Sequence, residues 1–92
     1  MSGTPRSRVS RGQYGVLTIR YYWKGRQIGL ATLMEGAVGS LEVDDRHGPA
    51  VLHDLERRGG SGAWASGDGA ALFRKCGWTE DKPGHFVKAR PA

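Results

Sequence analysis

An alternation of apolar and polar residues between positions 14 and 34 restricts the fold more than any other feature of this chain. The segment Tyr14–Trp23 is rich in β-branched and aromatic residues, which is typical of a strand. Lys24 and Gly25 follow it and predict a two-residue turn, because glycine supplies the positive φ that a tight hairpin needs. A second strand over residues 26–34 then returns alongside the first.

The register of this hairpin follows from the turn length. A two-residue turn sets Trp23 opposite Arg26 and Tyr21 opposite Ile28, and opposed residues share a face. In this register one face is apolar and the other is mostly polar, a division that a shift of one residue would destroy. The apolar face is predicted to hold Leu17, Ile19, Tyr21, Ile28 and Leu30.

Turn and helix signals after the hairpin indicate the fold class. A third strand is expected over residues 37–43, a helix that begins near Pro49 and ends at Gly59, and a short strand over 63–65. A helix over 69–76 and a last strand over 85–89 follow. We therefore expect one compact α+β domain over residues 13–92, an antiparallel three-stranded meander followed by α-β-α-β. Residues 1–12 are polar and basic and are expected to form a disordered arm.

Positive charge is concentrated at the N-terminal end of the chain. Six basic residues and no acidic residue precede Glu35, whereas the remainder has 8 basic and 9 acidic residues, which together give the net charge of +5. This asymmetry favours a polyanionic partner such as nucleic acid, a phosphate-bearing ligand or an acidic protein face, although a solubilising role for the arm explains it equally well.

The cysteine and hydrophobicity patterns indicate the environment of the protein. Cys76 is the only cysteine, so no internal disulfide can form, and a small secreted domain would carry several. No apolar run approaches the roughly 20 residues of a membrane span, and no secretory signal opens the chain. We expect a cytoplasmic protein that binds no metal, because three scattered histidines and one cysteine lack the spacing of a zinc site.

Two segments resemble the second half of the GNAT superfamily of N-acetyltransferases. The sequence AALFRKCGWTE is similar to the closing signature of that family, with matching residues Ala70, Leu72, Phe73, Lys75, Gly77 and Trp78. Upstream, SLEVDDRHGPAVLHDLERRG is similar to the strand, loop and helix that hold acetyl-CoA in the family. The resemblance implies the C-terminal half of a GNAT fold and a truncated domain.

The resemblance also implies a coenzyme site and a reaction, acetyl transfer to an amine. The coenzyme pyrophosphate would lie against the loop and helix start, where Arg46, His47, Gly48 and Ala50 stand. The spacing Arg-x-Gly-x-Ala is one residue shorter than the family motif. Glu42 is the candidate general base, and Phe73 stands where the family commonly has a tyrosine as acid.

Several functions remain open from the sequence. A binding module on this scaffold is favoured over an efficient acetyltransferase. A second alternative is a small inhibitor of the kind that mobile elements encode, such as an anti-CRISPR protein that docks on a host nucleoprotein complex. A third is non-specific nucleic-acid binding by the arm and hairpin, and a homodimer through an exposed strand edge is also expected. The residues predicted to contact a partner are Arg6, Arg8, Arg11, Arg20, Tyr22, Lys24 and Arg26.

Overall fold

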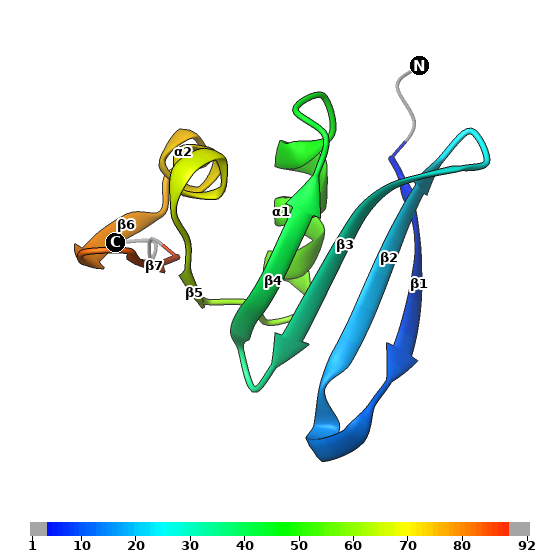
Figure 1. Ribbon diagram of the computed structural model, residues 1–92, viewed down its shortest axis with the longest axis horizontal. Coiled ribbons are helices and arrows are strands. Elements are labelled where there is room, and N and C mark those ends of the chain that lie inside the picture. Colours follow the sequence, from blue (N-terminus) through cyan, green and yellow to red (C-terminus); the bar gives the residue numbers. More distant parts are fainter. Residues whose placement is uncertain (1–3, 89–92) are drawn as a thin grey trace.

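The predicted hairpin lies inside a larger sheet, as the computed structural model of residues 4–88 shows (Figure 1). Two helices accompany that sheet, α1 (Gly48–Arg57) and α2 (Gly67–Lys75). The sheet order is β1-β2-β3-β4-β5-β7-β6, and every neighbouring pair is antiparallel except β4 and β5. The strands are β1 (Arg6–Arg11), β2 (Leu17–Trp23), β3 (Arg26–Met34), β4 (Ala37–Val43), β5 (Gly62–Trp64), β6 (Thr79–Lys82) and β7 (His85–Val87).

The expected α+β class is confirmed, with a mostly antiparallel sheet of seven strands and two helices in the described residues. The meander has four strands, however, because β1 precedes the predicted hairpin. A further strand, β6, was also missed and pairs with β7 at the far edge of the sheet. The last strand was predicted to reach residue 89, which lies outside the described residues.

The segment predicted as a disordered arm forms a strand instead. All six residues of β1 pair with β2, and Gly12 donates a backbone hydrogen bond to Val16 at the connection. The low hydrophobicity of this segment favoured the prediction of disorder. An edge strand can nevertheless be stabilised by backbone hydrogen bonds to its neighbour and by one side-chain contact with the rest of the domain. Here the Arg58 guanidinium donates to Ser7 Oγ at 2.8 Å and so ties β1 to α1. Residues 1–3 lie outside the described part of the chain.

The predicted register of the hairpin is correct at the turn and wrong beyond it. Trp23 pairs with Arg26, and a bulge between Tyr21 and Tyr22 then shifts the pairing by one residue. Arg20 consequently faces Leu30, which leaves Leu30 on the outer face of the sheet. The inner face of β3 is completed instead by Ala31 and Leu33, which are buried.

The core lies between the inner face of the sheet and the helices. Helix α1 contributes an apolar stripe at helical spacing, Val51, Leu52 and Leu55, and all three side chains are fully buried. Phe73 of α2 packs at the other end of the core between the rings of Trp78 and Phe86. Helix α1 lies behind β4 in Figure 1, and no described helix lies in front of β1–β4.

A polar network connects the sheet to α1 at the edge of this core. The Tyr21 hydroxyl donates to the Asp54 carboxylate at 2.7 Å, and Arg58 Nε donates to the same oxygen at 2.7 Å. Burial and then the hydrogen bond to Asp54 raise the pKa of Tyr21 far above its ordinary value of 10.0. The phenol therefore stays neutral in the folded protein and holds β2 against α1.

The helices are short. The longer one, α1, has 10 residues, and no helix within residues 4–88 is long and apolar enough to cross a membrane.

We predict that Tyr21→Phe lowers the free energy of unfolding by about 1 kcal/mol, because the hydrogen bond to Asp54 is lost while the ring still fills its site. Urea unfolding of the wild type and the variant at neutral pH measures this difference. The difference should shrink as the pH rises above about 10, where Tyr21 ionises in the unfolded chain and stabilises that state.

The matched control is Tyr14→Phe, because the Tyr14 side chain is 91% exposed in the β1–β2 connection. Its free energy of unfolding should equal that of the wild type. Equal losses in the two variants would show that the hydroxyl of Tyr21 does not stabilise the fold.

Candidate functional site

The outer face of β1 and β2 carries three arginine side chains in neighbouring positions. Strand pairing places Arg8 of β1 directly opposite Arg20 of β2 on this face. Two residues further along each strand, the next pair that faces outward is Arg6 and Tyr22. Residues in such pairs have side chains about 5 Å apart at Cβ, so the guanidinium groups form one cluster. We call Arg6, Arg8, Arg20 and Tyr22 the arginine face.

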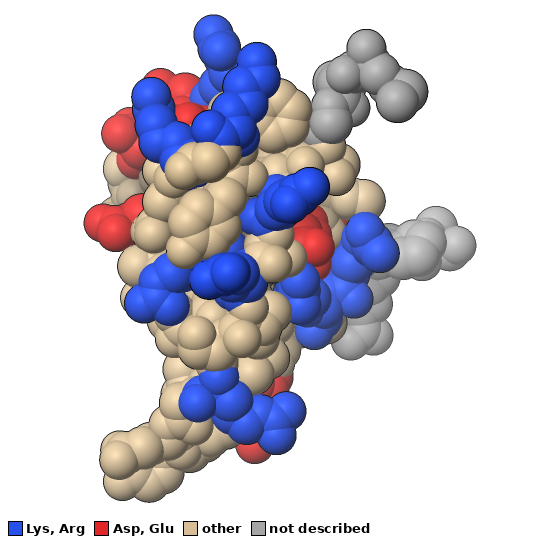
Figure 2. Space-filling model, turned by 90° about the vertical axis from the view of Figure 1, so that its right-hand side faces the viewer, with Lys and Arg blue, Asp and Glu red and all other residues tan. Residues whose placement is uncertain are grey.

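No carboxylate within residues 4–88 forms an ion pair with the arginine face, and Glu42, which lies in the same row as Arg20, is separated from it by Leu30. The ion pairs within the described chain involve Arg58, Arg74, His47 and His85, and none involves Arg6, Arg8 or Arg20. Like charges directly opposite each other on neighbouring strands destabilise a sheet. Figure 2, which views the molecule from the β1 edge, shows more Lys and Arg than Asp and Glu side chains on that side of the molecule.

The remaining predicted partner residues lie beyond the two ends of the arginine face, and Arg11 belongs to the other face of the sheet. Lys24 and Arg26 lie at the turn between β2 and β3, where Lys24 adopts the left-handed conformation with φ 51°. Arg11 is exposed at the opposite end, and its pairing with Leu17 places it in the row of the inner face. The predicted partner residues therefore form one surface over Arg6, Arg8, Arg20 and Tyr22, with Lys24 at its end.

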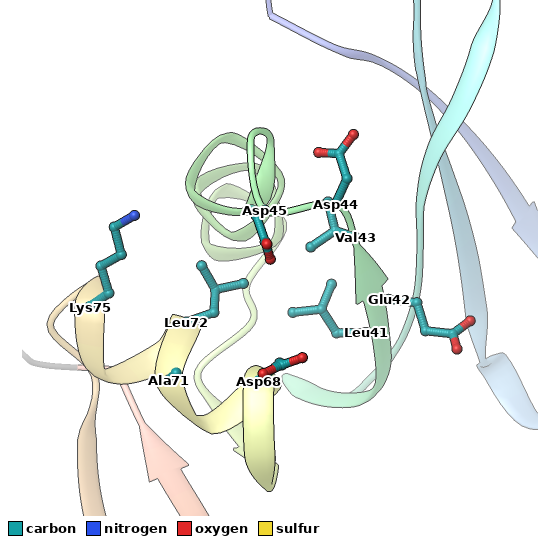
Figure 3. A pocket seen from close by; sticks show the side chains of 11 residues that line it. Leu41, Glu42, Val43, Asp44, Asp45, Asp68, Ala71, Leu72 and Lys75 are labelled. Atoms are coloured by element: carbon teal, nitrogen blue, oxygen red, sulfur yellow. The ribbon is translucent and has the colours of Figure 1, made fainter.

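A separate cleft opens where the sheet splits. Strands β4 and β5 pair only at Ala37–Gly62 and Val38–Ala63, and α2 begins soon after β5. A cleft of about 400 Å³ lies between β4, the start of α1, and α2 (Figure 3). Leu41, Val43 and Leu72 form its apolar wall. The charged residues that line it are Glu42, Asp44, Asp45, Asp68 and Lys75.

Neither residue assigned to acid–base chemistry points its side chain into this cleft, although Glu42 belongs to the strand that lines it. Glu42 is exposed, and Figure 3 shows its side chain pointing away from the cleft, because neighbouring residues of a strand face opposite sides. Phe73 is 1% exposed and packs in the core against Trp78 and Phe86. The cleft brings together carboxylates that the sequence interpretation did not select, above all Asp45, which points into it.

The predicted coenzyme loop is dispersed over different surfaces. Gly48 contacts α2 closely, since a Cβ at that position would lie 2.9 Å from Leu72. Ala50 faces a small hollow beside Tyr21 on the other side of α1, while Arg46 and His47 line a hollow at the hairpin turn. The loop amide of His47 donates to Asp44 Oδ1 at 2.8 Å, so the protein's own carboxylate occupies a donor that an anion would need.

The remaining reactive groups have structural environments. Burial and the nearby charge of Glu56 raise the pKa of the Cys76 thiol, which keeps it protonated and unreactive. Among residues 4–88, no cluster of three or more His, Cys, Asp or Glu side chains is arranged to hold a metal ion.

Comparison with known proteins gives no family for this chain. No protein-family profile, curated protein or solved structure matches it. The function must therefore be inferred from the arrangement of its own residues.

Proposed function

We propose that this protein binds single-stranded nucleic acid without sequence specificity through the arginine face. The observation that carries the proposal is the direct pairing of Arg8 with Arg20 on a face that no described helix covers, where no described carboxylate forms an ion pair with either arginine. A fold has no structural reason to place two like charges opposite each other, but a phosphate between them relieves the repulsion.

The chemistry of the face suits a phosphate backbone. Arginine binds phosphate through two parallel N–H donors, and Arg6, Arg8 and Arg20 all point outward from a continuous sheet surface. Tyr22 is half-buried beside Arg6, so one ring lies among the cations, where a base can stack on it. Sequence preference is not expected, because phosphate contacts and stacking on an aromatic ring do not distinguish one base from another.

We predict that replacing Arg6, Arg8 and Arg20 together by Thr weakens binding of a labelled single-stranded oligonucleotide and reduces its salt dependence. Each phosphate contact contributes about 0.7 to the slope of log K against log salt, so the loss of three lowers the slope by about 2. Threonine preserves the strands because it is a good strand former. Fluorescence anisotropy over a range of salt concentrations measures both quantities.

The matched control removes the same charge at the other edge of the sheet, with Lys75, Lys82 and Lys88 replaced by Thr. These residues lie on or next to α2, β6 and β7, and β6 is the edge strand opposite β1. The control should retain most of the affinity and the slope. Equal effects of the two triple variants would attribute binding to net charge alone, and binding that salt does not weaken would reject the proposal.

We also predict that Arg8→Thr makes the protein slightly more stable while it weakens oligonucleotide binding. The variant removes the repulsion with Arg20 and places a good strand former at the edge of the sheet. Urea unfolding should show a higher midpoint at low salt and a smaller gain at high salt, where the repulsion is screened. A loss of stability at low salt would show that Arg8 has a structural role instead.

A second candidate function is acetyl transfer from acetyl-CoA to an amine, and the cleft beside β4 is the observation that favours it. The strand, loop and helix that resemble the acetyl-CoA segment form part of its rim. Its electrostatics are unfavourable for this ligand, because Asp45 and Asp68 would face a polyanionic coenzyme. We therefore rank this function below nucleic-acid binding.

Calorimetry with acetyl-CoA tests this candidate. We expect no binding at millimolar coenzyme, because the carboxylates repel its phosphates and Asp44 already accepts from the loop amide. Micromolar binding that is lost in Arg46→Ala would contradict this expectation and make acetyl transfer the leading function.

A further inference from the structure

The turn of the β2–β3 hairpin and the β4–α1 loop enclose a hollow of about 460 Å³. It is formed by residues from two segments more than 15 positions apart in sequence, which meet because β3 begins and β4 ends at the same end of the meander. The hollow is lined by Trp23, Lys24, Arg26, Ile28, Asp44, Arg46 and His47. Its volume lies in the range of about 300–1,000 Å³ that is typical of small-molecule sites.

The hollow combines an aromatic wall with excess positive charge. The rings of Trp23 and His47 lie 5.4 Å apart between centroids with an angle of 47° between their planes, so they form two sides of one surface. The Lys24 ammonium lies 5.9 Å from the centroid of the Trp23 ring. A cation at that position shows that the face of the Trp23 ring is accessible to a mobile group.

The one carboxylate that lines the hollow cannot balance the charges of Lys24, Arg26 and Arg46. Asp44 Oδ1 lies 2.8 Å from His47 Nδ1 and accepts the backbone N–H of the same residue at 2.8 Å. Its partial burial opposes ionisation, but those hydrogen bonds and the nearby charge of Arg26 hold the pKa of Asp44 below its ordinary value. Neither Arg26 nor Arg46 makes an ion pair within residues 4–88.

We infer that this hollow binds one nucleotide of a single strand, with its phosphate between Arg26 and Arg46 and its base against the wall of Trp23 and His47. Two guanidinium groups from different segments match the several oxygens of a phosphate, and an indole ring stacks on any base. The base would take the position of the flexible Lys24 side chain. The hollow lies on the inner side of the sheet, where Ile28 and Trp23 pack with the core. A strand that follows the arginine face would reach it by passing over the hairpin turn at Lys24.

This inference rests on the proposed function, but it can be tested separately with a ligand too small to span the arginine face. The probe is AMP, titrated into the full chain by calorimetry and compared with adenosine and with inorganic phosphate. We expect AMP to bind in the millimolar range or tighter, and more tightly than either fragment, because only AMP uses both the cations and the aromatic wall.

Three variants locate the binding. Arg26→Gln with Arg46→Gln should weaken AMP by about tenfold or more, because hydrogen bonds between charged groups are lost. Trp23→Leu should reduce the affinity for AMP toward that for phosphate. Lys24→Asn keeps a residue suited to the turn, and tighter binding of AMP by this variant would show that the ammonium competes with the base. The control with Arg6, Arg8 and Arg20 replaced by Thr should bind AMP as the wild type does.

The outcomes separate this inference from the proposed function. Absence of AMP binding at millimolar concentration, or AMP affinity equal to that of inorganic phosphate, would overturn the inference even where the oligonucleotide binds. AMP binding that the Arg26 and Arg46 variant leaves unchanged would overturn it as well, since the site would lie elsewhere. AMP binding at the hollow without oligonucleotide binding would support a nucleotide site and reject the proposed function.

Discussion

Burial of one stripe of α1 against one face of the meander is the constraint on which the rest of this structure depends. Val51, Leu52 and Leu55 are fully buried, and they cover the inner face formed by Ile19, Tyr21 and their neighbours. Because no described helix covers the opposite face of β1–β4, that face remains in contact with solvent. Its side chains contribute little to the core, and arginines are tolerated there although they repel one another.

Local signals in the sequence were sufficient to predict the hairpin, whereas the longer-range pairing was not. Lys24-Gly25 and Glu35-Gly36 are turns with positive φ at both positions, as residue chemistry indicates for tight hairpins. The bulge between Tyr21 and Tyr22 could not be inferred from alternation alone. Gly29 on the partner strand is a signal for it, since glycine within a strand often marks a bulge. Strand β1 was missed because its stability comes from pairing with β2 and from the bond between Arg58 and Ser7.

The candidate site was only partly predictable for a topological reason. The sequence interpretation assigned Arg26 to a partner surface and Arg46 to a coenzyme loop, yet both line the same hollow. Antiparallel β3 and β4 lie side by side, so the turn before β3 and the loop after β4 must occur at one end of the sheet. Glu42 shows the opposite effect, because the alternation along β4 turns its side chain away from the cleft that its neighbours line.

The charges of the molecule are distributed unevenly between its two candidate surfaces, and this distribution is consistent with the proposal of binding rather than catalysis. Cations lie on the outer face of β1–β2 and at the hairpin turn, whereas Asp45 and Asp68 lie at the cleft where β4 leaves β5. An anionic ligand is therefore attracted toward the first surface and repelled from the second. The same arginines bear on the predicted homodimer, because two copies of β1 would bring like charges together at a free edge. A bound polyanion would act in the opposite way to a second copy of β1. Its phosphates would lie between Arg8 and Arg20 and relieve the repulsion between these two side chains.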